Sequence, residues 1–327
     1  MPELACPHQC SFCDQRQISG QDKLPDPVTI MNLIEAHLNS FTATEREVEI
    51  AFFGGTFTGL PLKTQEKFLK IVHPFIESAQ VNGIRISTRP DYIDEENLNL
   101  LKENGVTTIE LGAQSLDEEV LISSKRGHSA KDVEVASGLI LRYGFRLGLQ
   151  MMIGLPGDTP EKSKLTAQKI IDLGANETRI YPCLVIRNTL LARQFQLNEY
   201  LPIGLESAVE LTADLYQMFE KATVKVIRIG LHRNEDFDRG NFLAGPYHPN
   251  FMELVMTEIW RRNLEKLLRN SVNKQMNIFV QPSQLNFAVG FKAKNKMLLL
   301  QHFKKIAFKT DDSLSGRNFR IETMPDS

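Results

Sequence analysis

The chain has 327 residues, of which 42% are hydrophobic and 24% are charged, and its formal net charge is −2. This composition can bury a large core, which excludes an intrinsically disordered chain. No apolar run approaches the roughly 18 residues of a membrane-spanning helix, and the first residues lack the pattern of a secretory signal. We therefore expect a soluble cytoplasmic protein with no membrane partner.

Between about residue 27 and residue 187, helix and strand patterns alternate. Helical spacing of apolar residues is found over 27–40, 64–79, 94–105, 130–144 and 160–174. Buried-strand patterns are found over 47–55, 83–88, 106–113, 146–157 and 178–186. Strands that alternate regularly with helices form parallel sheets, so the sequence predicts an α/β fold with a full or partial (β/α) barrel.

After Leu201 the pattern changes. The predicted elements are a helix over 204–222, a strand over 224–231, a long helix over 251–270, and short strands over 276–280 and 318–323. We place a domain boundary near residue 200, with the barrel in residues 1–200 and a smaller basic α+β region in residues 201–327.

The charge is unevenly distributed along the chain. Residues 1–220 carry 20 Lys and Arg against 30 Asp and Glu, whereas residues 221–327 carry 18 against 10, a net of +8. A basic C-terminal third is typical of a region that binds a polyanion such as RNA. Solvated charge on surface helices explains the same count equally well.

Glycines and polar residues follow the predicted strands. They are Gly54-Gly55-Thr56, the run from Ser87 to Asp91, Gln114-Ser115, and the run from Gly154 to Gly157. The carboxyl ends of parallel barrel strands share one rim, where the chemistry of such folds collects. Each run is also an ordinary turn sequence, so the signal comes from the four runs together.

Three of the four cysteines, Cys6, Cys10 and Cys13, lie within eight residues of one another. A structural zinc site normally recruits four ligands as two separated pairs, and the remaining Cys183 falls in a predicted buried strand. Three thiolates on a short loop suit three irons of a [4Fe-4S] cluster. The fourth iron is then left to bind a small molecule, and a zinc site is the alternative.

The spacing Cys6-x3-Cys10-x2-Cys13, with Phe12 before the last cysteine and a (β/α) pattern after it, resembles the cluster motif of the radical S-adenosylmethionine (SAM) superfamily. The resemblance implies a partial (β/α)6 barrel whose unique iron chelates the amino and carboxylate groups of SAM. One electron, from a donor such as flavodoxin or ferredoxin, then cleaves the sulfonium. The resulting 5′-deoxyadenosyl radical abstracts a hydrogen atom from the substrate.

The same resemblance implies roles for the rim residues. Gly54-Gly55-Thr56 match the glycine motif at which bare backbone approaches the methionyl amino group. Gln114 and Ser115 fall where polar groups reach the ribose hydroxyls, and Met152-Ile153-Gly154, with Tyr181, fall where the adenine packs. Barrel core is an equal alternative for Met152 and Tyr181.

Four arginines, Arg89, Arg126, Arg179 and Arg228, lie at or near strand ends. We expect one or two of them to hold the cofactor carboxylate or a substrate phosphate. Structural ion pairs explain each of them equally well.

The stretches "ISTRPDYID", "IELGAQSLD" and "LQMMIGLPGDTP" resemble the radical-SAM part of the catalytic subunit of Elongator. That family modifies wobble uridines of tRNA and uses acetyl-CoA bound to a C-terminal acetyltransferase domain. This sequence ends at Ser327, so we expect no acetyltransferase domain. It also has five residues before Cys6, so we expect the first barrel strand to be truncated and encoded upstream of Met1.

Three functions remain open at this stage. The first is a radical SAM enzyme acting on tRNA or another RNA, supported by the basic residues Arg261, Arg262, Lys266, Arg269, Lys292, Lys294, Lys296, Lys304 and Lys305. The second is a radical SAM enzyme acting on a small molecule, similar to a coproporphyrinogen oxidase. The third is a non-catalytic binding protein derived from the barrel, which the intact cysteine triplet disfavours.

Overall fold

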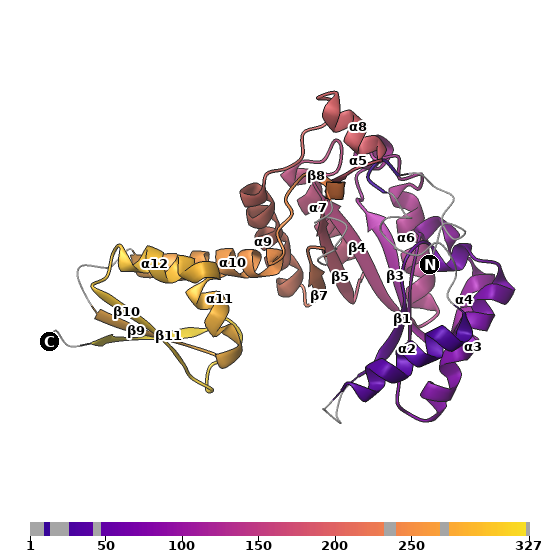
Figure 1. Ribbon diagram of the computed structural model, residues 1–327, viewed down its shortest axis with the longest axis horizontal. Coiled ribbons are helices and arrows are strands. Elements are labelled where there is room, and N and C mark those ends of the chain that lie inside the picture. The colour runs from indigo at the N-terminus through magenta and orange to yellow at the C-terminus, as the bar shows by residue number, and fades with distance from the viewer. Residues whose placement is uncertain (1–9, 14–25, 42–46, 232–239, 269–274, 325–327) are drawn as a thin grey trace. The chain divides into compact units, whose positions relative to one another are not determined.

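The computed structural model describes residues 10–13, 26–41, 47–231, 240–268 and 275–324 (Figure 1). The chain forms two compact units. The first comprises residues 1–203 and 217–246, and the second comprises residues 204–216 and 247–327. Residues 1–9 and 14–25 lie outside the described residues, and with them the predicted truncation of the first strand.

Six parallel strands form the sheet of the first unit, in the order β1-β2-β3-β4-β5-β7. Their bounds are Glu49–Phe52, Gly83–Thr88, Val106–Gln114, Arg146–Ile153, Glu177–Pro182 and Lys225–Ile229. The sheet is a curled half-barrel, so the predicted partial (β/α)6 barrel is confirmed. Its last strand, β7, pairs with β5, although the change of sequence pattern placed this segment after the boundary near residue 200.

The helices of this unit that pack against strands of the sheet are α3 (Leu62–Glu77), α4 (Glu95–Glu103), α6 (Ala130–Arg142) and α7 (Pro160–Asp172). The same unit contains α2 (Pro27–Asn39), α5 (Glu118–Ser123) and α8 (Leu190–Gln196). Alternate strand residues such as Ile84, Ile86, Ile109 and Leu111 are fully buried beneath α3, α4 and α6. Each such side chain contributes about 1.5–3 kcal/mol of hydrophobic free energy, and Figure 1 shows these helices beside the strands.

Polar N-cap side chains determine where several helices begin. The carboxylates of Asp94 and Asp117 accept backbone hydrogen bonds in the first turns of α4 and α5, and the Thr159 hydroxyl does so in α7. Ser129 and Asp132 form a reciprocal capping box at the start of α6. Each cap satisfies backbone donors that a helix leaves unpaired, which fixes the loops between the strand ends and the helices.

The second unit has its own core and a three-stranded sheet. Its elements are α10 (Phe251–Leu268), β9 (Gln275–Val280), α11 (Leu285–Val289), α12 (Lys294–Leu300), β10 (Lys305–Thr310) and β11 (Phe319–Met324). Strand β9 is central, parallel to β10 and antiparallel to β11. Trp260, Ile278, Leu299 and Ile306 belong to its buried apolar cluster. Helix α9 (Leu205–Lys221) contributes residues to both units.

Among the described helices of both units, none is long and apolar enough to cross a membrane.

Candidate active site

The described part of the cysteine loop, Cys10 to Cys13, is held by backbone hydrogen bonds at both sides. The Ser11 amide donates to the Ser124 carbonyl at the end of α5, at 2.9 Å, and the Ser11 carbonyl accepts from the Leu191 amide of α8, at 2.7 Å. The Cys13 amide donates to the Cys10 carbonyl at 3.1 Å and closes a turn. The loop position is therefore fixed by two helix ends, and Cys6 lies outside the described residues.

Phe12 anchors the loop in an apolar cluster that includes Leu155, Cys183 and Leu191. Cys183 has no exposed surface, and burial raises the pKa of its thiol to about 12. The expectation that Cys183 is a buried apolar residue is confirmed. Its neutral thiol packs among apolar side chains of the cluster that Phe12 contacts.

Arg126 connects the cysteine loop to strand β3. Its Nη1 donates a hydrogen bond to Cys10 Sγ at 3.4 Å, and its Nη2 donates to the Gly112 carbonyl at 2.7 Å. The sequence pattern places this arginine near a strand end but does not predict that it contacts a cysteine. The two residues are 116 positions apart, so a single sequence carries no direct signal of the contact.

The glycines after β1 have backbone conformations that favour glycine. Gly54 has a φ of 92° and Gly55 a φ of 76°. Thr56 follows with no exposed surface. The Thr58 and Thr88 hydroxyls share a hydrogen bond of 2.6 Å, which ties this turn to the end of β2. The backbone of Gly54 and Gly55, which carries no side chains, is therefore held at the carboxyl end of β1.

Several buried polar atoms near this rim have no hydrogen-bond partner within the described residues. They are Ser11 Oγ, Thr56 Oγ1, Arg89 Nη1, Gln114 Oε1, Arg126 Nε and His128 Nδ1. They belong to the cysteine loop, to the carboxyl ends of β1, β2 and β3, or to the loop after α5. Buried polar atoms without partners are costly, so their grouping at this rim fits a site built for a polar ligand.

Arg89 and His128 are two buried members of this group. Arg89 is 2% exposed and donates through Nε and Nη2 to the two carboxylate oxygens of Asp91, each at 2.9 Å. His128 shares a hydrogen bond with the Ala113 carbonyl at 3.2 Å. Burial, with the nearby guanidinium groups of Arg126 and Arg89, lowers the pKa of His128 to about 3. The imidazole is therefore neutral at physiological pH.

The predicted nucleoside-binding residues lie in different environments. The Ser115 hydroxyl shares a hydrogen bond of 3.3 Å with Thr166 of α7 and accepts from the Asp117 amide, so it is engaged inside the fold. The Ile153 side chain is fully buried. Met152 and Tyr181 are half-buried partners on the adjacent strands β4 and β5. The structure brings these two together, whereas the Ser115 hydroxyl and the Ile153 side chain are enclosed inside the fold.

Gly154, at the end of β4, is held by two side chains. Its amide donates to Asp158 Oδ2 at 2.8 Å, and its carbonyl accepts from the Tyr200 hydroxyl at 2.5 Å. Its φ is 74°, and a Cβ placed there would lie 2.7 Å from the Ile203 side chain. Glycine is therefore required at this position for both conformation and space.

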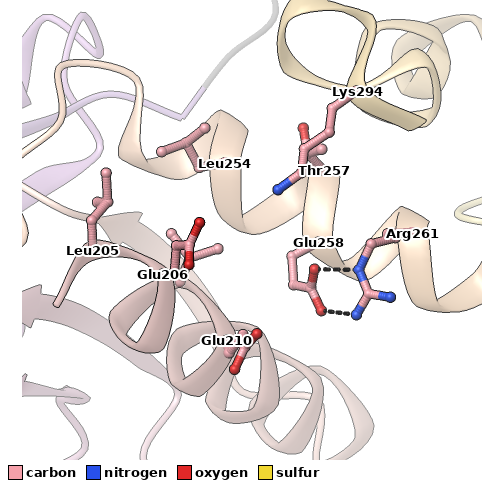
Figure 2. Close-up of a pocket in the computed structure, with 9 residues that line it drawn as sticks. Leu205, Glu206, Glu210, Leu254, Thr257, Glu258, Arg261 and Lys294 are labelled. Carbon is pink, nitrogen blue, oxygen red and sulfur yellow. Dashed lines mark hydrogen bonds and ion pairs between the residues drawn. The ribbon is translucent and has the colours of Figure 1, made fainter. Parts of the chain in front are cut away.

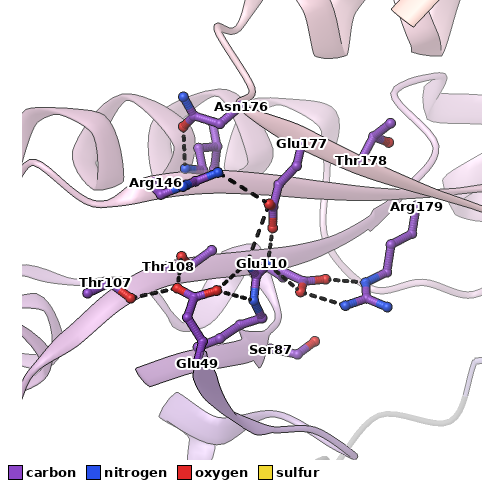
Figure 3. A network of polar contacts seen from close by, with 12 residues as sticks. Glu49, Ser87, Thr107, Thr108, Glu110, Arg146, Asn176, Glu177, Thr178 and Arg179 are labelled. Carbon is purple, nitrogen blue, oxygen red and sulfur yellow. Dashed lines mark hydrogen bonds and ion pairs between the residues drawn. The ribbon is translucent and has the colours of Figure 1, made fainter. Parts of the chain in front are cut away.

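Charged side chains from several strands form a network of polar contacts on the sheet (Figure 3), and most of them lie nearer the amino ends of their strands than the rim. Arg85 of β2 forms ion pairs with Glu49 of β1, Glu110 of β3 and Glu177 of β5. Arg179 of β5 donates to Glu110 through Nε and Nη2 and lies with its guanidinium 5.0 Å from the ring centre of Phe53. The network links strands that are not neighbours, so it braces the curl of the sheet.

A separate pocket of about 340 Å³ lies in the second unit (Figure 2). Leu205, Leu254, Thr257 and the acidic residues Glu206, Glu210 and Glu258 line it, together with Arg261 and Lys294. Arg261 is occupied by a two-point ion pair with Glu258 (Figure 2).

The basic residues predicted to face RNA differ in how far they are neutralised. Arg261 and Arg262 both pair with Glu258, and Arg262 also pairs with Asp214 at 2.6 Å. Lys266, Lys292, Lys294, Lys304 and Lys305 are exposed, Lys296 is half-buried, and Arg269 lies outside the described residues. The lysines therefore carry more of the available positive charge than the arginines of α10.

The family comparison agrees with the fold and with the cysteine loop. The model of the radical SAM superfamily matches residues 4–170, and that of the radical SAM C-terminal domain matches residues 175–261. The chain belongs to the radical SAM superfamily. It is an enzyme of this superfamily, and its cofactors are a [4Fe-4S] cluster and SAM.

Within the superfamily, the chain is similar to Elongator proteins. It is 30% identical to the tRNA uridine(34) acetyltransferase of Methanocaldococcus infernus, over 79% of this chain and 55% of the relative. It is 28% identical to human Elongator complex protein 3, over 78% of this chain and 54% of the relative. The solved archaeal Methanocaldococcus infernus Elp3 superposes with a TM-score of 0.63 at 29% identity, covering 74% of this chain and 59% of that one. The chain spans about half the length of the curated relatives it matches.

Proposed function

We propose that this protein is a tRNA-modifying radical SAM enzyme in which Cys6, Cys10 and Cys13 hold the [4Fe-4S] cluster. The observation that carries the proposal is the position of the cysteine loop. Cys10 is tied through Arg126 to the Gly112 carbonyl of β3, two residues before Gln114. The Cys10 thiol is therefore linked through one side chain to the strand that ends at the predicted SAM-binding rim.

When bound, the cluster and SAM supply a 5′-deoxyadenosyl radical that abstracts a hydrogen atom from the substrate. The chain's own residues bind SAM and orient it. Gly54 and Gly55 would offer bare backbone to the methionyl amino group, and the unpartnered Oε1 of Gln114 would accept a hydrogen bond from a ribose hydroxyl. Met152 and Tyr181, which are partners on β4 and β5, would pack against the adenine.

Water exclusion follows from the packing under the loop. Phe12, Leu155 and Leu191 close the apolar cluster beneath the cysteines, and a dry site protects a reactive radical from side reactions. The electron enters from a donor such as flavodoxin or ferredoxin. A cytoplasmic location, expected from the sequence, is part of the same proposal.

The tRNA substrate is supported by the similarity to relatives named tRNA uridine(34) acetyltransferase and Elongator complex protein 3. The exposed lysines of the second unit supply phosphate-binding charge. The acetyl-transfer activity named for the archaeal relative is not proposed for this chain, because the match covers 55% of that relative.

Anaerobic reconstitution with iron and sulfide, followed by dithionite and SAM, tests the function. We expect 5′-deoxyadenosine, detected by liquid chromatography, to form and to increase when total tRNA is added. A Cys13→Ala variant is the matched control and should form none. Absence of 5′-deoxyadenosine from the wild-type protein contradicts the enzyme assignment.

The same assay distinguishes the substrate classes. A rate of 5′-deoxyadenosine formation that does not respond to tRNA, together with no salt-dependent tRNA binding, contradicts the RNA substrate. That outcome favours the small-molecule alternative.

A further inference from the structure

Arg126 is a buried guanidinium with two unlike acceptors. It is 7% exposed, and it donates to Cys10 Sγ through one terminal nitrogen and to the Gly112 carbonyl through the other. A planar guanidinium holds its donors in a fixed geometry. A hydrogen bond to the strand therefore sets the direction of the hydrogen bond to the sulfur.

The surrounding backbone is arranged around this side chain. Lys125 and Gly127, on either side of Arg126, both have positive φ, at 51° and 82°. A non-glycine residue in this region costs energy and marks a position where the fold imposes a conformation. A Cβ at Gly112 would lie 2.8 Å from Arg126 Nη2, so a bare residue on β3 provides the space that the guanidinium occupies.

The charge of Arg126 is not balanced by a carboxylate in the described part of the chain. Its hydrogen-bond acceptors there are a sulfur and a backbone carbonyl, and its Nε is buried without a partner. The neighbouring His128 is neutral, so it adds no charge. A buried cation is expensive unless negative charge lies beside it, and thiolate sulfurs bound to iron supply such charge.

We propose that Arg126 is a positioning residue of the iron–sulfur cluster, which donates a hydrogen bond to the Cys10 thiolate and makes the cluster easier to reduce. Hydrogen bonds to cluster sulfurs and the local net charge set the potential of such clusters. A cation beside a ligand sulfur stabilises the reduced, more negative form. The inference rests on the proposed role of Cys10 as a ligand and is independent of the tRNA substrate.

The first test measures the reduction midpoint potential of the reconstituted cluster by a titration followed by electron paramagnetic resonance, without SAM or tRNA. For Arg126→Gln we expect the ratio of reduced to oxidised cluster at a fixed potential to fall about tenfold, which is about 59 mV for one electron. Arg142→Gln, at an exposed arginine of α6, removes the same charge elsewhere and should leave the potential unchanged. An unchanged potential in an Arg126→Gln protein with normal iron content overturns the inference.

A second measurement covers the case in which Arg126→Gln fails to hold iron. Wild-type protein labelled with guanidino-15N arginine should show a weak 15N coupling to the reduced cluster in pulsed electron paramagnetic resonance. This coupling should disappear in equally labelled Arg126→Lys. Its absence from the wild-type protein overturns the inference while leaving the proposed function intact. A wild-type protein that binds no [4Fe-4S] cluster overturns both.

Discussion

Glu110 of β3 and Arg179 of β5 form a two-point ion pair across β4, with Nε to Oε2 at 2.6 Å and Nη2 to Oε1 at 2.9 Å. Glu110 is 1% exposed and also accepts from Arg85 of β2 at 2.9 Å. On β4, Gly148 is in register with Glu110 on one side and Glu177 on the other, and its lack of a side chain leaves room for the network. The curl of the sheet brings Glu110 and Arg179 within reach of each other, and their ion pair in turn stabilises the curl.

Glu110→Ala should destabilise the barrel strongly. The change leaves Arg179 and Arg85 as half-buried cations without their shared partner, and removing one member of a buried ion pair costs about 3–5 kcal/mol. Urea unfolding followed by circular dichroism measures the change in the free energy of unfolding. Glu134→Gln, which breaks the exposed pair with Lys131 on α6, is the control and should cost less than about 1 kcal/mol. Equal effects of the two changes would show that the network is not structural.

Gly148→Ala tests the space that the ion pair requires. A Cβ there would lie 2.8 Å from Glu110 Cγ and 3.4 Å from Glu177 Oε1, so the network must shift. We expect a loss of about 1–3 kcal/mol, typical of overpacking, measured by the same unfolding experiment. Gly138→Ala in α6 is the matched control, because a Cβ there meets no atom within 4 Å. It should stabilise the protein by up to about 1 kcal/mol through helix propensity. A neutral Gly148→Ala would contradict the packing argument.

The architecture could be predicted from the sequence because its signals are local. Apolar runs of strand length and helical periodicity both act within a few positions, and they indicated the five barrel strands up to residue 187. The pairing of β7 with β5 was not predicted, because Lys225 meets Glu177 across two intervening helices, α8 and α9. A boundary inferred from a change of pattern does not reveal which sheet a later strand joins.

The site was predicted less completely for the same reason. The thiol spacing is a local signal, whereas the hydrogen bond between Arg126 and Cys10 joins positions far apart in the sequence. Ser115 was expected to reach a ribose hydroxyl, and the hydrogen bond of its own hydroxyl to Thr166 comes from α7, the third helix after it, so no local signal reveals it. The charge of Arg261 and Arg262 was counted as available, although Glu258 lies three and four residues earlier on the same helix.

His128 should make the protein sensitive to acid. Its pKa is lowered from 6.5 to about 3 in the fold, so the unfolded chain binds the proton first as the pH falls. Stability contributed by the neutral imidazole is present above about pH 6.5 and is lost as the pH falls toward 3. Between pH 7 and pH 5 the wild type should lose about 2 kcal/mol more than His128→Gln, which does not titrate. Urea unfolding at the two pH values measures this difference.

The control for this prediction is His37→Gln, at an exposed histidine of α2. It should follow the wild-type pH dependence. If the free energy of unfolding of His128→Gln has the same pH dependence as that of the wild type, His128 is not held neutral in the folded protein.

Alanine variants of Cys10, Cys13 and Cys183 should differ in iron content. Cys10→Ala and Cys13→Ala should bind little iron after anaerobic reconstitution, because each removes one of three proposed ligands. Cys183→Ala should retain the wild-type iron content, because its thiol is fully buried in the apolar cluster. Iron and sulfide analysis, with the absorbance near 400 nm that is expected of such clusters, provides the comparison. Loss of iron in Cys183→Ala at unchanged secondary structure would show that this thiol takes part in holding the cluster.

The exposed lysines of the second unit should control binding to tRNA. In a variant with Lys292→Gln, Lys304→Gln and Lys305→Gln, we expect about tenfold weaker binding, since each exposed charge pair contributes about 0.2–1 kcal/mol. The plot of log affinity against log salt should become shallower by about 0.7–0.9 for each phosphate that the variant no longer neutralises. Lys63, Lys67 and Lys70 are exposed on α3 and, changed together to glutamine, remove the same charge from the first unit. Equal weakening in both triple variants would indicate attraction by net charge alone, whereas weakening confined to the second-unit variant would place the phosphate-binding residues there.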